Sequence, residues 1–301
     1  MRSPEEAKRA EGSEPPRTSK STLLPGTLVI VATPIGNLGD MTRRAVDSLA
    51  DAAVIACEDT RVTAKLLSAY GIKTPMLAYH EHNAARMRPL LIDRLKQGEI
   101  VALVSDAGTP LVSDPGYKLV EAAIAEDIPV TAAPGASALL TALVLSGLPS
   151  DRFLFAGFLP PKSPARRTEI RTLAAVPATL IFYEAPQRLA KALEDLADML
   201  GPRPAAVARE LTKRFEEVRR DTLESLAAHY REAPQPKGEI VILVGPPGEA
   251  VAETSEADLD SALTAALAVH SVKEAASLVA AETGLPRRAV YARALKLRAD
   301  D

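Results

Sequence analysis

Short apolar runs that alternate with helical segments constrain this chain more than any other feature. The first run, Thr27–Thr33, is rich in β-branched residues and is stopped by Pro34 and Gly36. A short run of this kind is typical of a strand that is buried on both faces. Strands that alternate with helices of about 10 to 15 residues predict βα units and a mainly parallel sheet.

The alternation continues through the first half of the chain. Further strands are predicted at residues 53–57, 100–104 and 128–132, and helices at residues 42–50, 59–70, 83–97, 115–126 and 136–146. A break near Gly147-Leu-Pro149 separates this half from a second half of the same class. There we predict strands at residues 153–158, 179–183, 205–209 and 239–244, with helices at 164–175 and 187–199.

The C-terminal part predicts a small helical module. Ser271 and Glu274 have the spacing of a capping box at the start of a helix that ends near Thr283, and Pro286 starts a second helix. Two helices joined by a short Gly-containing turn resemble a helix-turn-helix. The second helix has a basic face, which either is simply solvated or contacts nucleic acid; it carries Arg287, Arg288, Arg293, Lys296 and Arg298.

These patterns predict an α/β fold with two α/β domains and a helical appendage. We expect a disordered tail at residues 1–22, the first α/β domain at 23–148, the second at 149–248 and the helical module at 255–301. No sequence repeat relates the two halves.

The composition excludes several classes of protein. The chain has 301 residues, a formal net charge of −3 and a single cysteine, Cys57, so it has neither an intramolecular disulfide nor a zinc cluster of several Cys. A generic polyanion binder is usually basic, so any nucleic-acid contact must use local patches. No apolar run approaches the roughly 20 residues of a spanning helix, and the charged N-terminus is not a secretory signal. We therefore expect a cytoplasmic protein.

Common nucleotide and hydrolase motifs are absent from the sequence. There is no P-loop, no dinucleotide fingerprint after the first strand and no Gly-x-Ser-x-Gly elbow. His80 and His82 could in principle bind a metal, but no clear third ligand is near and an ordinary loop is the simpler interpretation. We expect no metal site.

Four loops rich in small residues follow predicted strands of the first half, at residues 32–40, 57–61, 105–116 and 133–138. In open α/β sheets, ligands bind at the carboxyl ends of strands. Arg61 is the only basic residue of these loops, so a phosphate-rich ligand is not favoured. The alternative is that they are merely tight turns. The residues alone thus predict a polar ligand held by backbone groups and do not name it.

Five segments in and around these loops resemble the tetrapyrrole methylase family. They are Ala32–Thr42, Cys57–Thr63, Tyr79–Asn83, Ser105–Pro110 and Phe182–Arg188, within a similarity that spans about Pro25 to Val244. Within the family they are similar to a branch that methylates the ribose 2′-hydroxyl of a decoding-site cytidine in 16S ribosomal RNA. The resemblance implies a homodimer of two-domain chains, with S-adenosylmethionine in the cleft between the domains and no metal.

The resemblance also implies the residues of the cofactor pocket. From the first domain they are Pro34, Ser105, Asp106, Ala107, Gly108, Thr109, Val112, Ala136, Ser137 and Ala138. From the second domain, Tyr183, Leu211 and Gly238 are expected on the adenosine side.

A general base would help the reaction, because a ribose hydroxyl is a poor nucleophile until its proton leaves. The candidates in the matched loops are Glu58, Asp59, His80 and Glu184, and Arg61 could neutralise a neighbouring phosphate. Glu58 and Asp59 could instead cap the helix that follows them, and Glu184 could simply hold its loop. The sequence does not choose among these roles.

RNA binding requires positive surface, and three segments offer it. The segment that adjoins the expected cleft carries Lys162, Arg166, Arg167 and Arg171, and we predict that it binds RNA. A second segment has Lys213, Arg214, Arg219 and Arg220, diluted by Glu216, Glu217 and Asp221. The third is the basic C-terminal helix. The substrate is expected to be 16S rRNA in a structured or assembled small ribosomal subunit.

Two other functions remain open from the sequence. A methyltransferase acting on a tetrapyrrole would have the same fold and cofactor, although residues 57–63 and 79–83 match the RNA branch. A non-catalytic RNA-binding or ribosome-assembly factor would rely on the C-terminal module and would bind no cofactor.

Overall fold

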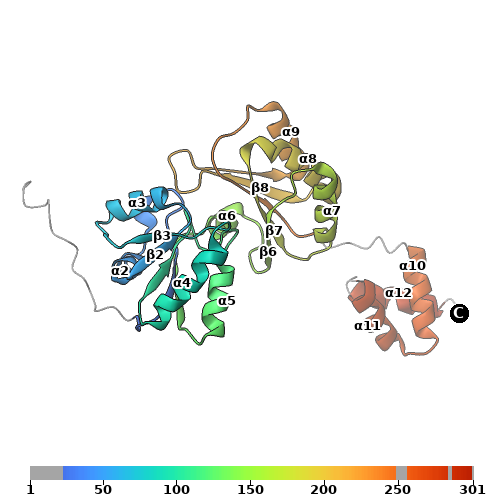
Figure 1. Ribbon diagram of the computed structural model, residues 1–301. Coiled ribbons are helices and arrows are strands. Elements are labelled where there is room, and N and C mark those ends of the chain that lie inside the picture. The colour runs from blue at the N-terminus through green and yellow to red at the C-terminus, as the bar shows by residue number, and fades with distance from the viewer. Residues whose placement is uncertain (1–22, 249–255, 284–286, 300–301) are drawn as a thin grey trace, which may run out of the picture.

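The computed structural model of the chain describes residues 23–248, 256–283 and 287–299. The tail predicted at residues 1–22 lies outside them, as do Gly284 and Pro286 of the predicted turn. Figure 1 shows two α/β regions, each built on one sheet, and a group of three helices near the C-terminus.

The first sheet is entirely parallel and has the strand order β3-β2-β4-β1-β5. Successive residues of β1 pack into different cores, Leu28 on one face of the sheet and Val29 on the other. Both faces are therefore covered, which explains the continuous apolar runs. The strands are β1 (Leu28–Val31), β2 (Val54–Cys57), β3 (Met76–Ala78), β4 (Val101–Leu103) and β5 (Val130–Ala133).

Helices cover both faces of this sheet. The helices α2 (Arg43–Asp51) and α3 (Thr60–Ala69) pack on the Val29 face, and α4 (Ala84–Lys96) and α5 (Tyr117–Ala125) on the Leu28 face. The short helix η1 (Leu38–Asp40) follows β1. The helix α6 (Ala138–Ser146) joins the two halves, because its Leu139 and Leu143 share a core with residues of the second sheet.

The second sheet is mixed, in the order β6-β7-β10-β8-β9. Only β6 and β7 pair in parallel, and the three other pairs are antiparallel. Its strands are β6 (Phe153–Phe158), β7 (Thr179–Glu184), β8 (Pro204–Arg209), β9 (Glu217–Thr222) and β10 (Ile240–Val244). The helices α7 (Ser163–Leu173), α8 (Leu189–Leu200) and α9 (Leu223–Glu232) pack on one face, and η2 (Pro186–Arg188) precedes α8.

The expectation that the second half repeats the class of the first is therefore only partly right. Strands and helices do alternate, but β8, β9 and β10 run antiparallel to their neighbours. The sequence does not predict β9, which reads Glu-Val-Arg-Arg-Asp-Thr and lies at the sheet edge, where charged side chains face solvent. The short strand β3 and the helix α9 are also missed.

The C-terminal module has its own small core. The helices α10 (Glu256–Leu267), α11 (Val272–Thr283) and α12 (Arg287–Ala299) enclose Leu263, Val279 and Val290. The predicted capping box is confirmed, because the Ser271 amide donates to Glu274 over 3.1 Å and the Glu274 amide donates to the Ser271 hydroxyl over 3.4 Å.

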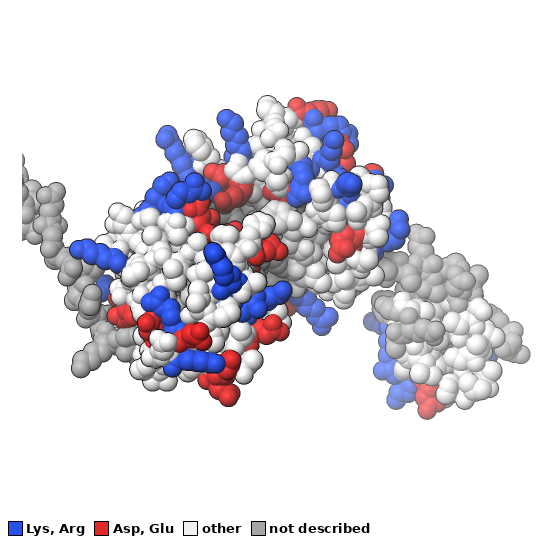
Figure 2. All heavy atoms as spheres, viewed as in Figure 1, with Lys and Arg blue, Asp and Glu red and all other residues white. Residues whose placement is uncertain are grey.

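Part of the basic face of α12 is neutralised within the module. The Arg293 guanidinium pairs with Asp260 of α10 at 2.6 Å, whereas Arg287, Arg288 and Lys296 are exposed. Figure 2 shows Lys and Arg side chains along one edge of the module, while basic and acidic side chains are mixed over the rest of this view.

The described residues contain neither a membrane-spanning helix nor a cluster of metal-binding side chains. None of their helices has both the length and the apolar character needed to cross a membrane. They also contain no group of three or more His, Cys, Asp and Glu side chains suited to a metal ion.

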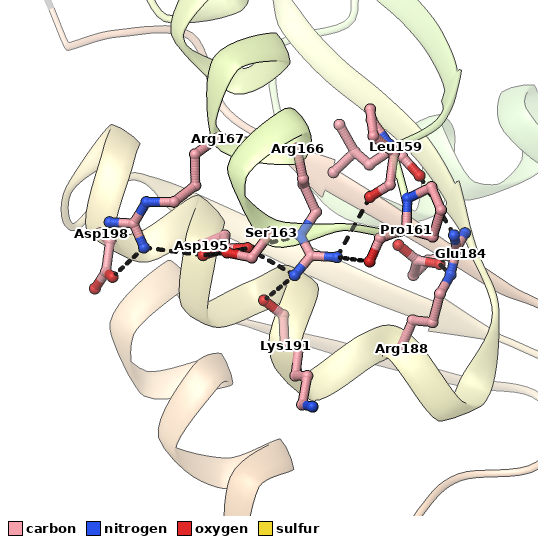
Figure 3. Close-up of polar contacts among 11 residues, drawn as sticks. Leu159, Pro161, Ser163, Arg166, Arg167, Glu184, Arg188, Lys191, Asp195 and Asp198 are labelled. Atoms are coloured by element: carbon pink, nitrogen blue, oxygen red, sulfur yellow. Dashed lines mark hydrogen bonds and ion pairs between the residues drawn. The ribbon is translucent and has the colours of Figure 1, made fainter.

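A buried ion pair fixes the loop that follows β6. Arg166 of α7 and Asp195 of α8 are 3% and 7% exposed, and the Arg166 Nη2 atom lies 2.6 Å from the carboxylate. The guanidinium also donates to the carbonyl oxygens of Pro160 and Pro161, at 3.4 and 3.2 Å. Figure 3 shows this guanidinium between the carboxylate on one side and the loop on the other.

These contacts correct the prediction that Arg166 binds RNA. Its guanidinium is buried and bonded to protein groups, so a phosphate cannot reach it. Arg167 is partly exposed but pairs with both Asp195 and Asp198 at 2.9 Å. Lys162 and Arg171 are exposed. Arg166 therefore holds the loop in place, whereas RNA binding by the exposed Lys162 and Arg171 stays a prediction.

Replacing Arg166 with Ala should lower the free energy of unfolding by about 3–5 kcal/mol, because the buried Asp195 carboxylate loses its main partner. Urea denaturation followed by circular dichroism measures this change. Arg171→Ala, on the exposed last turn of the same helix, is the matched control and should shift stability by no more than about 0.5 kcal/mol. Equal effects of the two substitutions would contradict the structural role.

Candidate functional site

The loops after the first-sheet strands are bonded to one another at the carboxyl edge of the sheet. Thr33, after β1, and Gly108, after β4, exchange two backbone hydrogen bonds of 2.8 and 3.0 Å. The Thr109 hydroxyl then donates to the carbonyl of Ala136, after β5, over 3.1 Å. Because the sheet is parallel, all these loops emerge on the same side and form one continuous wall.

A cavity of about 340 Å³ lies between this wall and the second sheet. It is large enough for a small organic ligand. From the first domain it is lined by Ile35, Ala107, Gly108, Thr109, Val112, Ser113, Asp114, Ser137 and Ala138. From the second it is lined by Phe158, Tyr183, Glu184, Ala185, Pro186, Gly238, Glu239, Ile240 and Val241.

The predicted cofactor residues gather at this cavity, some on its surface and some behind it. Eight of them line it, namely Ala107, Gly108, Thr109, Val112, Ser137, Ala138, Tyr183 and Gly238. Pro34 is not a lining residue, and its neighbour Ile35 takes that place. Ser105 and Leu211 are buried and do not line the cavity, and Ala136 accepts a hydrogen bond from Thr109 through its carbonyl. Asp106 is exposed beside the cavity wall and accepts a hydrogen bond from the Asp59 amide.

The cavity is lined by acidic side chains and by small residues that leave the main chain close to its surface. Asp114, Glu184 and Glu239 line the cavity, and none of its described lining residues is Lys, Arg or His. Gly108 has a φ of +78°, and a Cβ atom on it would lie 3.3 Å from the Ile35 side chain. The cavity thus suits a cationic or neutral ligand that approaches the main chain, and not a phosphate-rich one.

Asp114 is the lining residue with the most perturbed acidity. Burial is the largest of the effects that raise its pKa to about 6, and the nearby carboxylates of Glu58 and Asp106 act in the same direction. Asp114 lies in the loop that the sequence singles out, but its burial and its approach to Glu58 depend on the fold. The sequence therefore predicts this loop but not the perturbed acidity of Asp114.

The candidate bases after β2 and β3 differ in their surroundings. Asp59 caps α3, accepting from the Arg61 amide over 2.8 Å, and its carboxylate pairs with the Arg61 guanidinium at 2.6 Å. These hydrogen bonds lower the pKa of Asp59 to about 2, which makes it a weak base. The alternative that Asp59 caps the helix is thus confirmed. The ion pair with Asp59 also occupies the Arg61 guanidinium, which is predicted from the sequence to neutralise a phosphate.

Glu58 and His80 lie beside Asp59, but their side chains are less fully hydrogen-bonded. Burial raises the pKa of the Glu58 carboxyl, the neighbouring Asp106 raises it further, and His80 acts in the opposite direction. The Nδ1 atom of His80 is buried and has no hydrogen-bond partner among the described residues. Neither side chain is among those that line the cavity, although Glu58 is close enough to raise the pKa of Asp114.

Glu184 is held as a structural group. Its side chain is 1% exposed and pairs with Arg188, whose guanidinium also donates to the Leu159 carbonyl over 3.4 Å. One carboxylate oxygen also accepts from the Ala185 amide over 2.7 Å. Figure 3 shows Glu184 and Arg188 on the far side of the loop from Arg166, so two guanidinium groups hold this loop. This arrangement agrees with the alternative that Glu184 holds its loop.

Comparisons of the sequence identify two matching families. Residues 27–227 match the Tetrapyrrole (Corrin/Porphyrin) Methylases, and residues 253–298 match the RsmI C-terminal HTH domain. A protein of Mesorhizobium japonicum named ribosomal RNA small subunit methyltransferase I is 55% identical, over 90% of this chain and 92% of its own length. A protein of Xylella fastidiosa with the same name is 51% identical, over 89% of this chain and 98% of its own.

Solved structures share the fold at low sequence identity. Cobalt precorrin-4 methyltransferase, a cobalamin biosynthetic enzyme, matches with a TM-score of 0.56 and 19% identity over 73% of this chain and 95% of its own. Uroporphyrin-III C-methyltransferase from Thermus thermophilus, in complex with S-adenosylhomocysteine, matches with a TM-score of 0.50 and 22% identity over 72% of this chain and 96% of its own. The chain therefore belongs to the tetrapyrrole methylase family, in the group of the ribosomal RNA small subunit methyltransferase I proteins.

Proposed function

We propose that the protein transfers the methyl group of S-adenosylmethionine to the ribose 2′-hydroxyl of a decoding-site cytidine in 16S rRNA. The observation that carries the proposal is the 55% identity to a ribosomal RNA small subunit methyltransferase I over nearly the whole of both chains. The segments at residues 57–63 and 79–83, which resemble the 2′-hydroxyl branch of the family, support the acceptor. We further propose that the protein acts in the cytoplasm, as a homodimer, on the small ribosomal subunit.

The cavity between the two sheets fits the proposed cofactor. S-adenosylmethionine carries a positive sulfonium and no phosphate, and the described lining residues include no Lys, Arg or His. Of the three lining carboxylates, Glu184 pairs with Arg188 and Glu239 with Lys213, which leaves Asp114 to meet the positive charge. The main chain at Gly108, Ser137 and Ala138 is accessible to the amino-acid part of the ligand, and Tyr183 and Gly238 lie on the opposite wall. The related enzyme bound to S-adenosylhomocysteine has the same fold, which supports S-adenosylmethionine as the cofactor.

Glu58 is the general base that we propose. Its raised pKa makes it a better proton acceptor near neutral pH than Asp59, whose pKa is about 2. Glu184 lines the cavity, but its side chain is almost fully buried and one carboxylate oxygen is held by Arg188 and the Ala185 amide, so it is less suited than Glu58 to meet a ribose hydroxyl. His80, which is partly exposed and lies near Glu58, is then suited to orient the ribose or its phosphate neighbour.

The division of labour among these residues is simple. S-adenosylmethionine, when bound, would supply an electrophilic methyl group and leave as S-adenosylhomocysteine, and the Glu58 carboxylate would accept the proton that the 2′-oxygen loses. The wall of Gly108 and Thr109, tied to Thr33 and Ala136, keeps the ligand fixed relative to the acceptor. Proximity and orientation can account for much of the acceleration of such a transfer.

The charge of Asp114 should make cofactor affinity depend on pH. Its raised pKa means that the carboxyl is neutral below about pH 6 and charged above it. A bound sulfonium stabilises the charged form, so the affinity for S-adenosylmethionine should weaken by up to about tenfold for each pH unit below 6. Titration calorimetry between pH 5 and pH 8 measures this dependence.

Asp114→Asn is the control for this titration and should remove the pH step. The neutral thioether S-adenosylhomocysteine should show a smaller step with the unaltered protein. A pH step that persists in Asp114→Asn would assign the titration to another group.

Glu58→Gln should lower kcat by about 10²- to 10⁴-fold with little change in the Kd for S-adenosylmethionine, because the proton acceptor is lost and the cavity lining is intact. Rapid-quench assays on small subunits and calorimetry provide the two numbers. Glu184→Gln and Asp59→Asn serve as comparison variants. Full activity in Glu58→Gln would rule out Glu58 as the base.

The proposal as a whole is tested with labelled S-adenosylmethionine and unmodified small ribosomal subunits. We expect label in 2′-O-methylcytidine at the decoding site. Label transferred to a tetrapyrrole and not to RNA would overturn the acceptor and keep the cofactor. RNA binding without cofactor binding would instead identify a non-catalytic assembly factor.

A further inference from the structure

The loop between β8 and β9, residues 210–216, has a fixed and unusual backbone. Glu210 and Thr212 have left-handed φ values of +51° and +64°, which non-glycine residues rarely adopt. Surrounding contacts hold these conformations. The Thr212 amide donates to Glu216 over 2.6 Å, and the Glu210 amide donates to the Glu239 carbonyl over 3.0 Å. A loop held in this way presents its tip in one orientation.

The loop reaches from the second sheet to the entrance of the cavity. Lys213 pairs with Glu210 at 2.8 Å and with the cavity residue Glu239 at 3.2 Å. Its aliphatic chain lies against Gly36 of the first domain, where an added Cβ would be 2.4 Å from the Lys213 Cγ. Gly36 adjoins Ile35, another lining residue. In Figure 1 the loop after β8 extends toward the first α/β region.

The tip of the loop carries an exposed aromatic ring beside a cation. The Phe215 side chain is 65% exposed, and the Arg214 guanidinium lies 5.5 Å from the centroid of its ring. The charge of Lys213 is already matched by two carboxylates, whereas Arg214 is exposed. Packing in the protein core therefore does not explain why a phenyl ring stands at this position. The ring is a flat apolar surface with an adjacent positive charge, and it faces outward next to the cavity.

We propose that Phe215 and Arg214 form a stacking platform for an unpaired base of the RNA substrate, next to the nucleotide that is methylated. Proteins recognise single-stranded RNA by stacking unstacked bases on aromatic rings and guanidinium planes. The adjacent phosphate would lie near Arg214, so one loop contacts both base and backbone. This inference rests on the proposed function, since it takes RNA as the substrate, and it adds a contact that the basic segment around Arg166 does not provide.

Three substitutions at Phe215 distinguish stacking from other uses of the ring. Phe215→Ala removes the surface, Phe215→Leu keeps an apolar side chain without a flat face, and Phe215→Trp keeps the flat face. The full-length protein is titrated with an unpaired RNA oligonucleotide of decoding-site sequence that carries 2-aminopurine, whose fluorescence falls when the base stacks. We expect the Ala and Leu variants to bind about 5- to 150-fold more weakly, and the Trp variant to bind as the unaltered protein does.

Two additional measurements distinguish base stacking from a protein–protein contact. They also distinguish failure of the stacking role from failure of the proposed function. The affinity for S-adenosylmethionine and the oligomeric state in sedimentation should be the same in all three variants. Unchanged RNA affinity in Phe215→Ala, full affinity in Phe215→Leu, or dissociation of oligomers in Phe215→Ala would each overturn the stacking role. If the unaltered protein binds the oligonucleotide through Phe215 but does not methylate small subunits, the proposed function fails and the platform stands.

Discussion

The backbone bridge between Thr33 and Gly108 is the contact on which the rest of the site depends. It joins the loops after β1 and β4, and the Thr109 hydroxyl extends the connection to Ala136 after β5. A parallel sheet brings these loops to one edge, but only their mutual hydrogen bonds turn them into a continuous wall. The second sheet closes the cavity from the other side, and α6 packs against that sheet together with Ile35 of the loop after β1.

Local signals account for most of what could be predicted from the sequence. Apart from β3, the strands and main helices of the first half follow from buried apolar runs and from loops rich in Pro and Gly, and the structure places them within a few residues. The loops that line the cavity are predictable for the same reason. The acidity of Asp114 is not, because its raised pKa comes mainly from burial and then from Glu58, which the fold brings near from another strand end. Arg166 looks like a solvated cation until its partner on α8, Asp195, is known.

The charges of the molecule are arranged in two zones. Carboxylates concentrate at the cavity and beside it, at Asp114, Glu184, Glu239, Glu58 and Asp106. Many of the basic side chains of the second domain are bound by protein carboxylates, as Arg167, Arg188 and Lys213 are. An overall charge of −3 is compatible with an RNA substrate where exposed cations such as Arg214 make local contacts, together with contacts of another kind such as stacking.

The wall of small residues has a consequence for how such proteins diversify. A ligand held by main-chain groups and tight turns leaves few side chains committed to it, because Gly108, Ser137 and Ala138 offer mostly backbone. The side chains that would select an acceptor lie outside this wall. They are on the segments after β2 and β3 and on the loop after β8. The fold can therefore exchange acceptors by altering its rim while the cavity is retained. The shared architecture of this chain and of enzymes whose names refer to corrin or porphyrin compounds is what such a separation would produce.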